Sequence, residues 1–86
     1  MAGLMIPKNL PIAEIYVPVK RRNTLDQAKV DALAESILEN GLEAPILVRR
    51  DDSKGLVLVE GLHRLEACRA LGEEEIACLL VQARQH

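Results

Sequence analysis

Four prolines and five glycines divide this chain of 86 residues into short apolar segments, and the spacing of these residues limits the folds open to it. No segment approaches the roughly 20 consecutive apolar residues with which a helix crosses a bilayer. The chain has the length of one small domain. Its apolar content of 49% and charged content of 28% are typical of a globular protein. The sequence therefore predicts short helices and strands around one aliphatic core.

The composition excludes several classes of function. Tyr16 is the only aromatic residue, which excludes a surface that stacks nucleic-acid bases on aromatic rings. The net charge of −2 lacks the basic excess of a protein that coats a duplex, so only local basic patches are open to the chain, at Lys20–Arg22 and Arg49–Arg50. Two cysteines, Cys68 and Cys78, are too few for a disulfide framework, which favours a cytoplasmic location. We expect both to pack as small buried residues.

The N-terminal part of the chain predicts a leader, a strand and a basic loop. We expect residues 1–10 to form a flexible leader and residues 11–86 to form a single domain. A short strand is predicted within residues 11–19, because β-branched residues nearly alternate there and Pro18 ends the pattern. Lys20–Arg22 then forms a basic loop.

An amphipathic helix follows. Thr24 and Gln27 have the spacing of a capping box. Gly41 is a typical residue just after the end of a helix. Between them, apolar residues recur at intervals of three and four, as on one face of a helix. These residues are Val30, Leu33, Ala34, Ile37 and Leu38.

The second half predicts a hairpin, a helix and a final strand. Residues 46–50 and 56–60 are expected to pair as a hairpin with a five-residue loop. A second helix is expected over residues 62–71, closed by Gly72. Residues 76–81 are apolar throughout, which favours a strand inside the sheet. The predicted order is β-α-β-β-α-β, an α+β fold with a mixed sheet and two helices.

The junction between the hairpin and the second helix carries the candidate chemistry. Backbone N–H groups in the first turn of a helix have no partner within it, and they attract anions. Gly61 allows a phosphate to approach this backbone closely, while His63 and Arg64 add donors in the same turn. The alternative is structural: Gly61 serves only the turn, His63 is exposed, and Arg64 pairs with Glu60 or Glu35.

Lys29 and Ser36 add to this hypothesis. At 100° per residue, the two lie on one edge of the apolar stripe of the first helix. That edge faces the Gly61 turn if the two helices pack together. The alternative is a solvated lysine whose methylenes cover the rim of the core.

Two segments resemble the ParB N-terminal/sulfiredoxin superfamily: Gly41–Arg49, and Val59–Ala67 with its Glu60–Arg64 box. The resemblance extends from about Ile12 to Gln82 and implies a ParB/sulfiredoxin-like fold. In ParB proteins the second segment holds CTP phosphates, and in sulfiredoxin it holds ATP phosphates. The implied cofactor is therefore ATP or CTP with Mg²⁺.

The resemblance also implies roles for individual residues. The residues implied to bind phosphate or nucleotide are Lys29, Ser36, Gly61, Leu62, His63 and Arg64. Ala32 stands where the family has a further hydroxyl. Leu62 stands where sulfiredoxin has its catalytic cysteine, so reduction of a sulfinic acid through that thiol is not expected. No catalytic residue and no metal site are predicted.

Three functions stay open at this point. The first is a nucleotide- or phosphate-binding module with a regulatory or DNA-associated role. The second is a nucleotide-dependent enzyme, an NTP hydrolase, nuclease or kinase, that uses His63 and Glu60; a similar motif is typical of free-serine kinases. The third is a structural domain with a decayed site. A nucleotide or phosphate ligand is expected and a membrane is not, while DNA, a DNA-bound protein and a homodimer stay open as partners.

Overall fold

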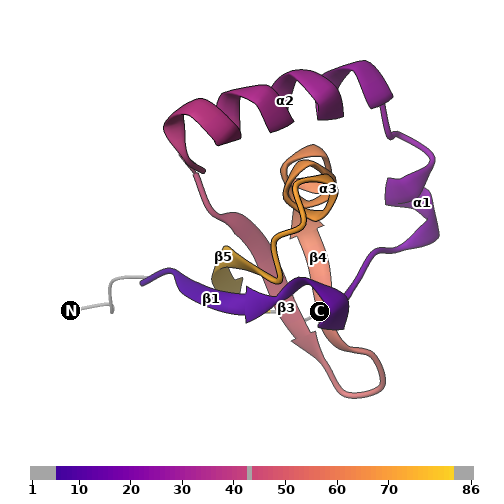
Figure 1. The fold of residues 1–86 in the computed structure, drawn as a ribbon. Coiled ribbons are helices and arrows are strands. Elements are labelled where there is room, and N and C mark those ends of the chain that lie inside the picture. The colour runs from indigo at the N-terminus through magenta and orange to yellow at the C-terminus, as the bar shows by residue number, and fades with distance from the viewer. Residues whose placement is uncertain (1–5, 43, 83–86) are drawn as a thin grey trace.

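A computed structural model describes residues 6–42 and 44–82 as a five-stranded sheet with its helices gathered on one face (Figure 1). In chain order the elements are β1 (Lys8–Pro11), a 3₁₀ turn η1 (Ile12–Glu14), β2 (Ile15–Tyr16), α1 (Val19–Arg22), α2 (Gln27–Asn40), β3 (Ile46–Asp51), β4 (Gly55–Glu60), α3 (Leu62–Ala70) and β5 (Glu75–Val81).

The sheet is mixed, as predicted. Its strand order is β1-β5-β3-β4-β2. The β1–β5 and β3–β4 pairs are antiparallel, whereas the β3–β5 and β2–β4 pairs are parallel. The final strand lies between β1 and β3, which confirms the interior position that its apolar sequence indicates.

Helix α3 lies between α2 and the sheet and packs against both (Figure 1). The core includes Ile46 and Val48 of β3 and Leu65 of α3, all fully buried. Cys68 and Cys78 are buried free thiols, as expected. No helix within residues 6–42 and 44–82 is both long enough and apolar enough to cross a membrane.

Two predictions for the N-terminal region are wrong. Lys8–Leu10 of the expected leader belong to β1, because their backbone pairs with residues 76–78 of β5. The pairing satisfies backbone hydrogen-bonding groups on that edge of β5. The expected strand over residues 11–19 is broken into η1, β2 and the start of α1. Pro18 is the N-cap of α1, and its carbonyl accepts from the amides of Arg21 and Arg22, which closes the first helical turn. The expected basic loop is therefore helical.

Helix α2 begins at a different cap from the one predicted. Asp26 is the N-cap, and its carboxylate accepts from the amide of Ala28 at 3.0 Å. The Thr24 hydroxyl instead donates to the carbonyl of Arg21. Val30 is buried as expected, but Leu38 is 75% exposed because it lies at the edge of the apolar stripe, turned away from α3.

The turn between β4 and α3 requires a residue without a side chain, and Gly61 supplies it. Gly61 has a φ of +113°, in the left-handed region that favours glycine. A Cβ atom at this position would lie 2.6 Å from Cγ2 and 2.8 Å from Cβ of Ile46. Since Ile46 is fully buried, the contact fixes where α3 leaves the sheet.

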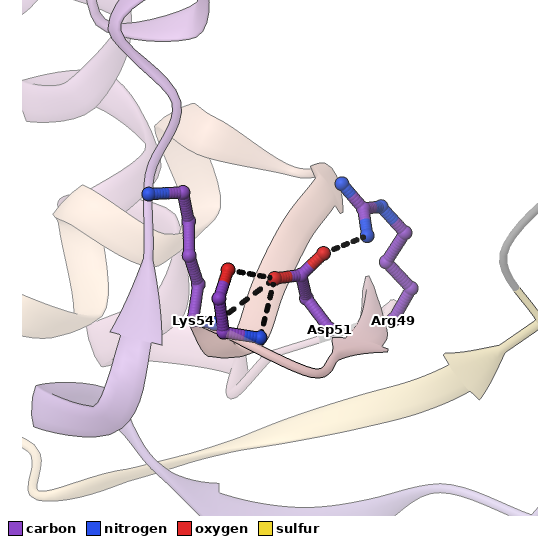
Figure 2. A network of polar contacts seen from close by, with 4 residues as sticks. Arg49, Asp51 and Lys54 are labelled. Carbon is purple, nitrogen blue, oxygen red and sulfur yellow. Dashed lines mark hydrogen bonds and ion pairs between the residues drawn. The ribbon is translucent and has the colours of Figure 1, made fainter.

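The hairpin of β3 and β4 is confirmed, with a loop shorter than predicted because Asp51 pairs with Gly55. Oδ2 of Asp51 accepts from the Ser53 hydroxyl and from the amides of Ser53 and Lys54, at 2.9–3.0 Å (Figure 2). These bonds lower the pKa of the Asp51 carboxyl to about 2. Figure 2 shows the Lys54 side chain running away from this carboxylate; its Nζ lies 4.5 Å from the centre of the Tyr16 ring.

The Asp51 turn predicts a pH dependence of stability. Because the folded pKa lies below the ordinary value of 3.8, the contribution of the carboxylate is fully present above about pH 4 and is lost as the pH falls through about 2. Urea unfolding of the wild type and of Asp51→Ala at pH 7, 4, 3 and 2 measures this loss. The variant is expected to lose less free energy of unfolding across that interval. Asp52→Ala is the control, and it is expected to lose as much free energy of unfolding as the wild type. If Asp52→Ala and Asp51→Ala lose equal amounts between pH 7 and pH 2, the assignment to Asp51 is contradicted.

A second prediction concerns the contact between Gly61 and Ile46. Gly61→Ala should lower the free energy of unfolding by about 1–2 kcal/mol for the left-handed backbone and by a further ~1–3 kcal/mol for overpacking. Gly72→Ala is the matched control, because Gly72 also has a positive φ of 82° but nothing lies within 4 Å of the added Cβ. Urea unfolding compares the two variants. Equal losses would show that the approach to Ile46 costs nothing.

Candidate functional site

The first turn of α3 presents unpartnered amide donors. The carbonyl of Gly61 accepts from the amide of Leu65 at 2.9 Å, which is the first hydrogen bond of the helix. No side chain caps this end. Among the described residues, nothing accepts from the amides of Leu62, His63 or Arg64. Three N–H groups at the positive end of a helix dipole are therefore free to bind an anion.

The side chain of Arg64 lies over the same turn. Its Nη2 atom lies 3.3 Å from the position that a Cβ atom of Gly61 would occupy. No carboxylate of the described residues forms an ion pair with it. The structural alternative, in which Arg64 pairs with Glu60 or Glu35, is therefore not what the structure shows. A half-buried guanidinium without an acidic partner is suited to two oxygens of a phosphate.

A cleft of about 450 Å³, the turn cleft, opens in front of these donors. Residues Glu60–Arg64 form one wall, and Arg21, Thr24 and Leu33 form the other. Arg21, which the sequence predicts only as part of a basic loop, thus lines this cleft. The signal available was the run Lys20–Arg22, but only the helical turn of α1 selects Arg21 from it.

A smaller cleft of about 190 Å³, the side cleft, adjoins the turn cleft. Arg64 and Leu33 line both. Ser36 lines the side cleft beside apolar residues of α2 and of the segment that follows it. Lys29 is exposed in the first turn of α2 and lines neither cleft. The structure therefore brings Ser36 next to Arg64, while Lys29 stays on the surface close to the start of its helix.

His63 was open to a structural interpretation as an exposed side chain, but it has a hydrogen-bond partner. Its Nε2 accepts a hydrogen bond from the backbone amide of Asp26 at 3.0 Å. The ring is half-buried and lines the turn cleft together with Glu60, whose carboxylate is exposed. Among the described residues, no group of three His, Cys, Asp or Glu side chains gathers as metal ligands.

Leu62 lies in the core, only 6% exposed. Neither cysteine supplies a thiolate nearby, because both are buried. Desolvation raises the pKa of the Cys78 thiol to about 11. Desolvation, and to a smaller extent the Glu73 charge, also raises the pKa of the Cys68 thiol. Both groups are therefore protonated at neutral pH.

Comparison with known proteins places this chain in a family. The model of the ParB N-terminal domain matches residues 3–86. The chain is 41% identical over 63 residues to a probable chromosome-partitioning protein ParB of Campylobacter jejuni, covering 73% of this chain and 22% of that protein. It is 39% identical over 69 residues to sulfiredoxin of Arabidopsis thaliana, covering 80% of this chain and 54% of that protein. The chain thus spans about a fifth to a half of these relatives.

Solved structures have the same fold. Sulfiredoxin from Arabidopsis thaliana superposes with a TM-score of 0.80 at 35% identity, over 91% of this chain and 86% of that one. C-terminally truncated ParB from Caulobacter crescentus, complexed with CTP-γ-S, gives 0.79 at 24% identity, over 93% of this chain and 46% of that one. Because the family model matches nearly the whole chain, the protein belongs to the ParB N-terminal domain family.

Proposed function

We propose that this chain is a nucleotide-binding regulatory domain whose first α3 turn holds the phosphates of a nucleoside di- or triphosphate. The observation that carries the proposal is the set of donors without partners at this turn, the amides of Leu62–Arg64 and the guanidinium of Arg64. Arg21 supplies a second cation across the turn cleft. A polyphosphate gains from both, because hydrogen bonds to charged groups are roughly twice as strong as neutral ones.

The side cleft is proposed to hold the sugar and base. It opens beside Arg64, so a nucleotide with its phosphates on the turn reaches it directly. Ser36 offers a hydroxyl there, and Leu33, Ile37 and Leu42 offer apolar surface. Lys29 remains in the proposal through the family resemblance alone.

The relatives support a nucleotide as the ligand. The Caulobacter crescentus ParB structure contains CTP-γ-S, and the Campylobacter jejuni relative is a probable chromosome-partitioning protein. These names favour a regulatory, DNA-associated role over metabolic chemistry. CTP and ATP, each with and without Mg²⁺, are therefore the ligands to compare.

Two features favour binding over catalysis. Leu62 offers an alkyl group where a sulfinic acid reductase needs a thiolate, and both cysteines are buried thiols. For a nucleotide-dependent enzyme that uses His63 and Glu60, Nε2 of His63 is already occupied by the amide of Asp26. That nitrogen is not free to accept a proton from a substrate.

Arg64→Ala should weaken nucleotide binding by about 1.5–3 kcal/mol, because it removes charged hydrogen bonds to the phosphates. Isothermal titration of wild type and variant with CTP and ATP measures the loss. Thermal unfolding checks it independently, since a ligand at 100 times its Kd stabilises the folded state by ~2.7 kcal/mol.

Lys20→Ala is the matched control. It removes the same charge from the surface as Arg21→Ala does, but Lys20 does not line the turn cleft. We expect Arg21→Ala to weaken binding and Lys20→Ala to leave it nearly unchanged. If Arg64→Ala binds nucleotide with unchanged affinity, the phosphates do not bind at this turn and the proposal is contradicted.

A further inference from the structure

One hydrogen bond joins the starts of the two long helices. His63 is the second residue of α3, and Asp26 is the N-cap of α2, 37 positions earlier in the chain. Asp26 uses two groups here: its carboxylate accepts from the amide of Ala28, and its own amide donates to Nε2 of His63. An N-cap amide lies outside the hydrogen-bond ladder of its helix, so the imidazole satisfies a donor that the backbone leaves free.

This bond selects one tautomer of the neutral ring. A ring nitrogen that accepts a hydrogen bond carries a lone pair, so the proton of a neutral imidazole sits on the other nitrogen. In the neutral ring of His63, the proton therefore sits on Nδ1. The tautomer is set by the backbone of α2 and does not depend on any ligand.

The same bond fastens one wall of the turn cleft. Arg21 and Thr24, which line that wall, belong to the connection of residues 19–26 that leads into α2. The other hydrogen bonds of this connection are local: Thr24 donates to the carbonyl of Arg21, and Nε of Arg22 donates to the carbonyl of Val17. Within the described part of the chain, the bond from Asp26 to His63 is the only hydrogen bond between this connection and α3.

We propose that His63 is a positioning residue: through Nε2 it holds residues 19–26 against α3, so the placement of Arg21 across the turn cleft depends on it. This deepens the proposed function, because it couples ligand binding on α3 to the position of the start of α2. The ligand gains affinity from His63 through Arg21 and the shape of the cleft. Direct donation from the imidazole is not required.

Two substitutions separate positioning from direct donation. Gln places its amide oxygen near the position of Nε2 and keeps an acceptor for the amide of Asp26. Asn is shorter, reaches only the position of Nδ1, and keeps a donor there. Positioning predicts that His63→Gln preserves the function of the ring and His63→Asn does not. A direct contact through Nδ1 predicts the reverse.

The tautomer and the fastening are tested without ligand. A long-range ¹H–¹⁵N spectrum of the wild type at neutral pH should show the proton on Nδ1 of His63. Amide exchange of Asp26 should be about two- to tenfold faster in His63→Asn than in the wild type, the range expected for one hydrogen bond to a neutral group, and close to wild type in His63→Gln. A proton on Nε2, or unchanged exchange in His63→Asn, would overturn the proposal.

Affinity for inorganic pyrophosphate tests the coupling. The wild type and His63→Gln are expected to bind pyrophosphate with similar affinity, and His63→Asn is expected to bind it about two- to tenfold more weakly. If His63→Asn binds as well as the wild type while His63→Gln binds weakly, His63 is a direct donor and the proposal fails. If the wild type binds neither pyrophosphate nor nucleotide, the proposed function fails, and the exchange of Asp26 still decides whether His63 fastens the connection.

Discussion

The approach of Gly61 to Ile46 is the contact on which the rest of the structure depends. Ile46 is fully buried in β3, in the middle of the sheet, and it leaves no room for a Cβ atom on the turn that follows β4. The chain therefore passes close over the sheet and enters α3 at once. As a result, the free amides at the start of the helix lie beside the core, and the guanidinium of Arg64 folds back over the same glycine.

A second constraint comes from α2. Its N-cap amide bonds to His63, so the positive ends of two helices meet near one point. The dipole of α2 is partly compensated there by the Asp26 carboxylate, whereas no side chain caps the start of α3. An anion is therefore expected to bind in front of α3. The connection that carries Arg21 forms the opposite wall, and a cation on that wall adds to the attraction.

The sequence was informative where the determinants were local. The hairpin, α3 and the end of α2 at Gly41 follow from alternation, helical periodicity and glycine positions, all of which act within a few residues. The donors at the Gly61 turn were predicted for the same reason. The unpaired state of Arg64 was not, because an acid such as Glu60 was within reach along the chain and only the packed geometry keeps it away.

The errors came from interactions distant in sequence. β1 forms because β5 offers an edge 64–70 residues later in the chain, a pairing that no local pattern of Lys8–Pro11 reveals. Residues 11–19 predict one strand, because their β-branched residues fit a strand as well as a short turn. Arg21 could not be told from its neighbours until α1 set its direction, and the contact of His63 with the backbone of Asp26 has no signature in side-chain types.

In the proposed complex, phosphate oxygens accept from the amides at the start of α3. Titration of ¹⁵N-labelled protein with nucleotide, followed by amide chemical shifts, tests this binding mode. The resonances of the Leu62, His63 and Arg64 amides are expected to move downfield together, in a saturable way, and more than those elsewhere in the chain. Saturable binding that leaves these three amides unmoved, or that shifts the Ser53–Lys54 turn more strongly, would contradict it.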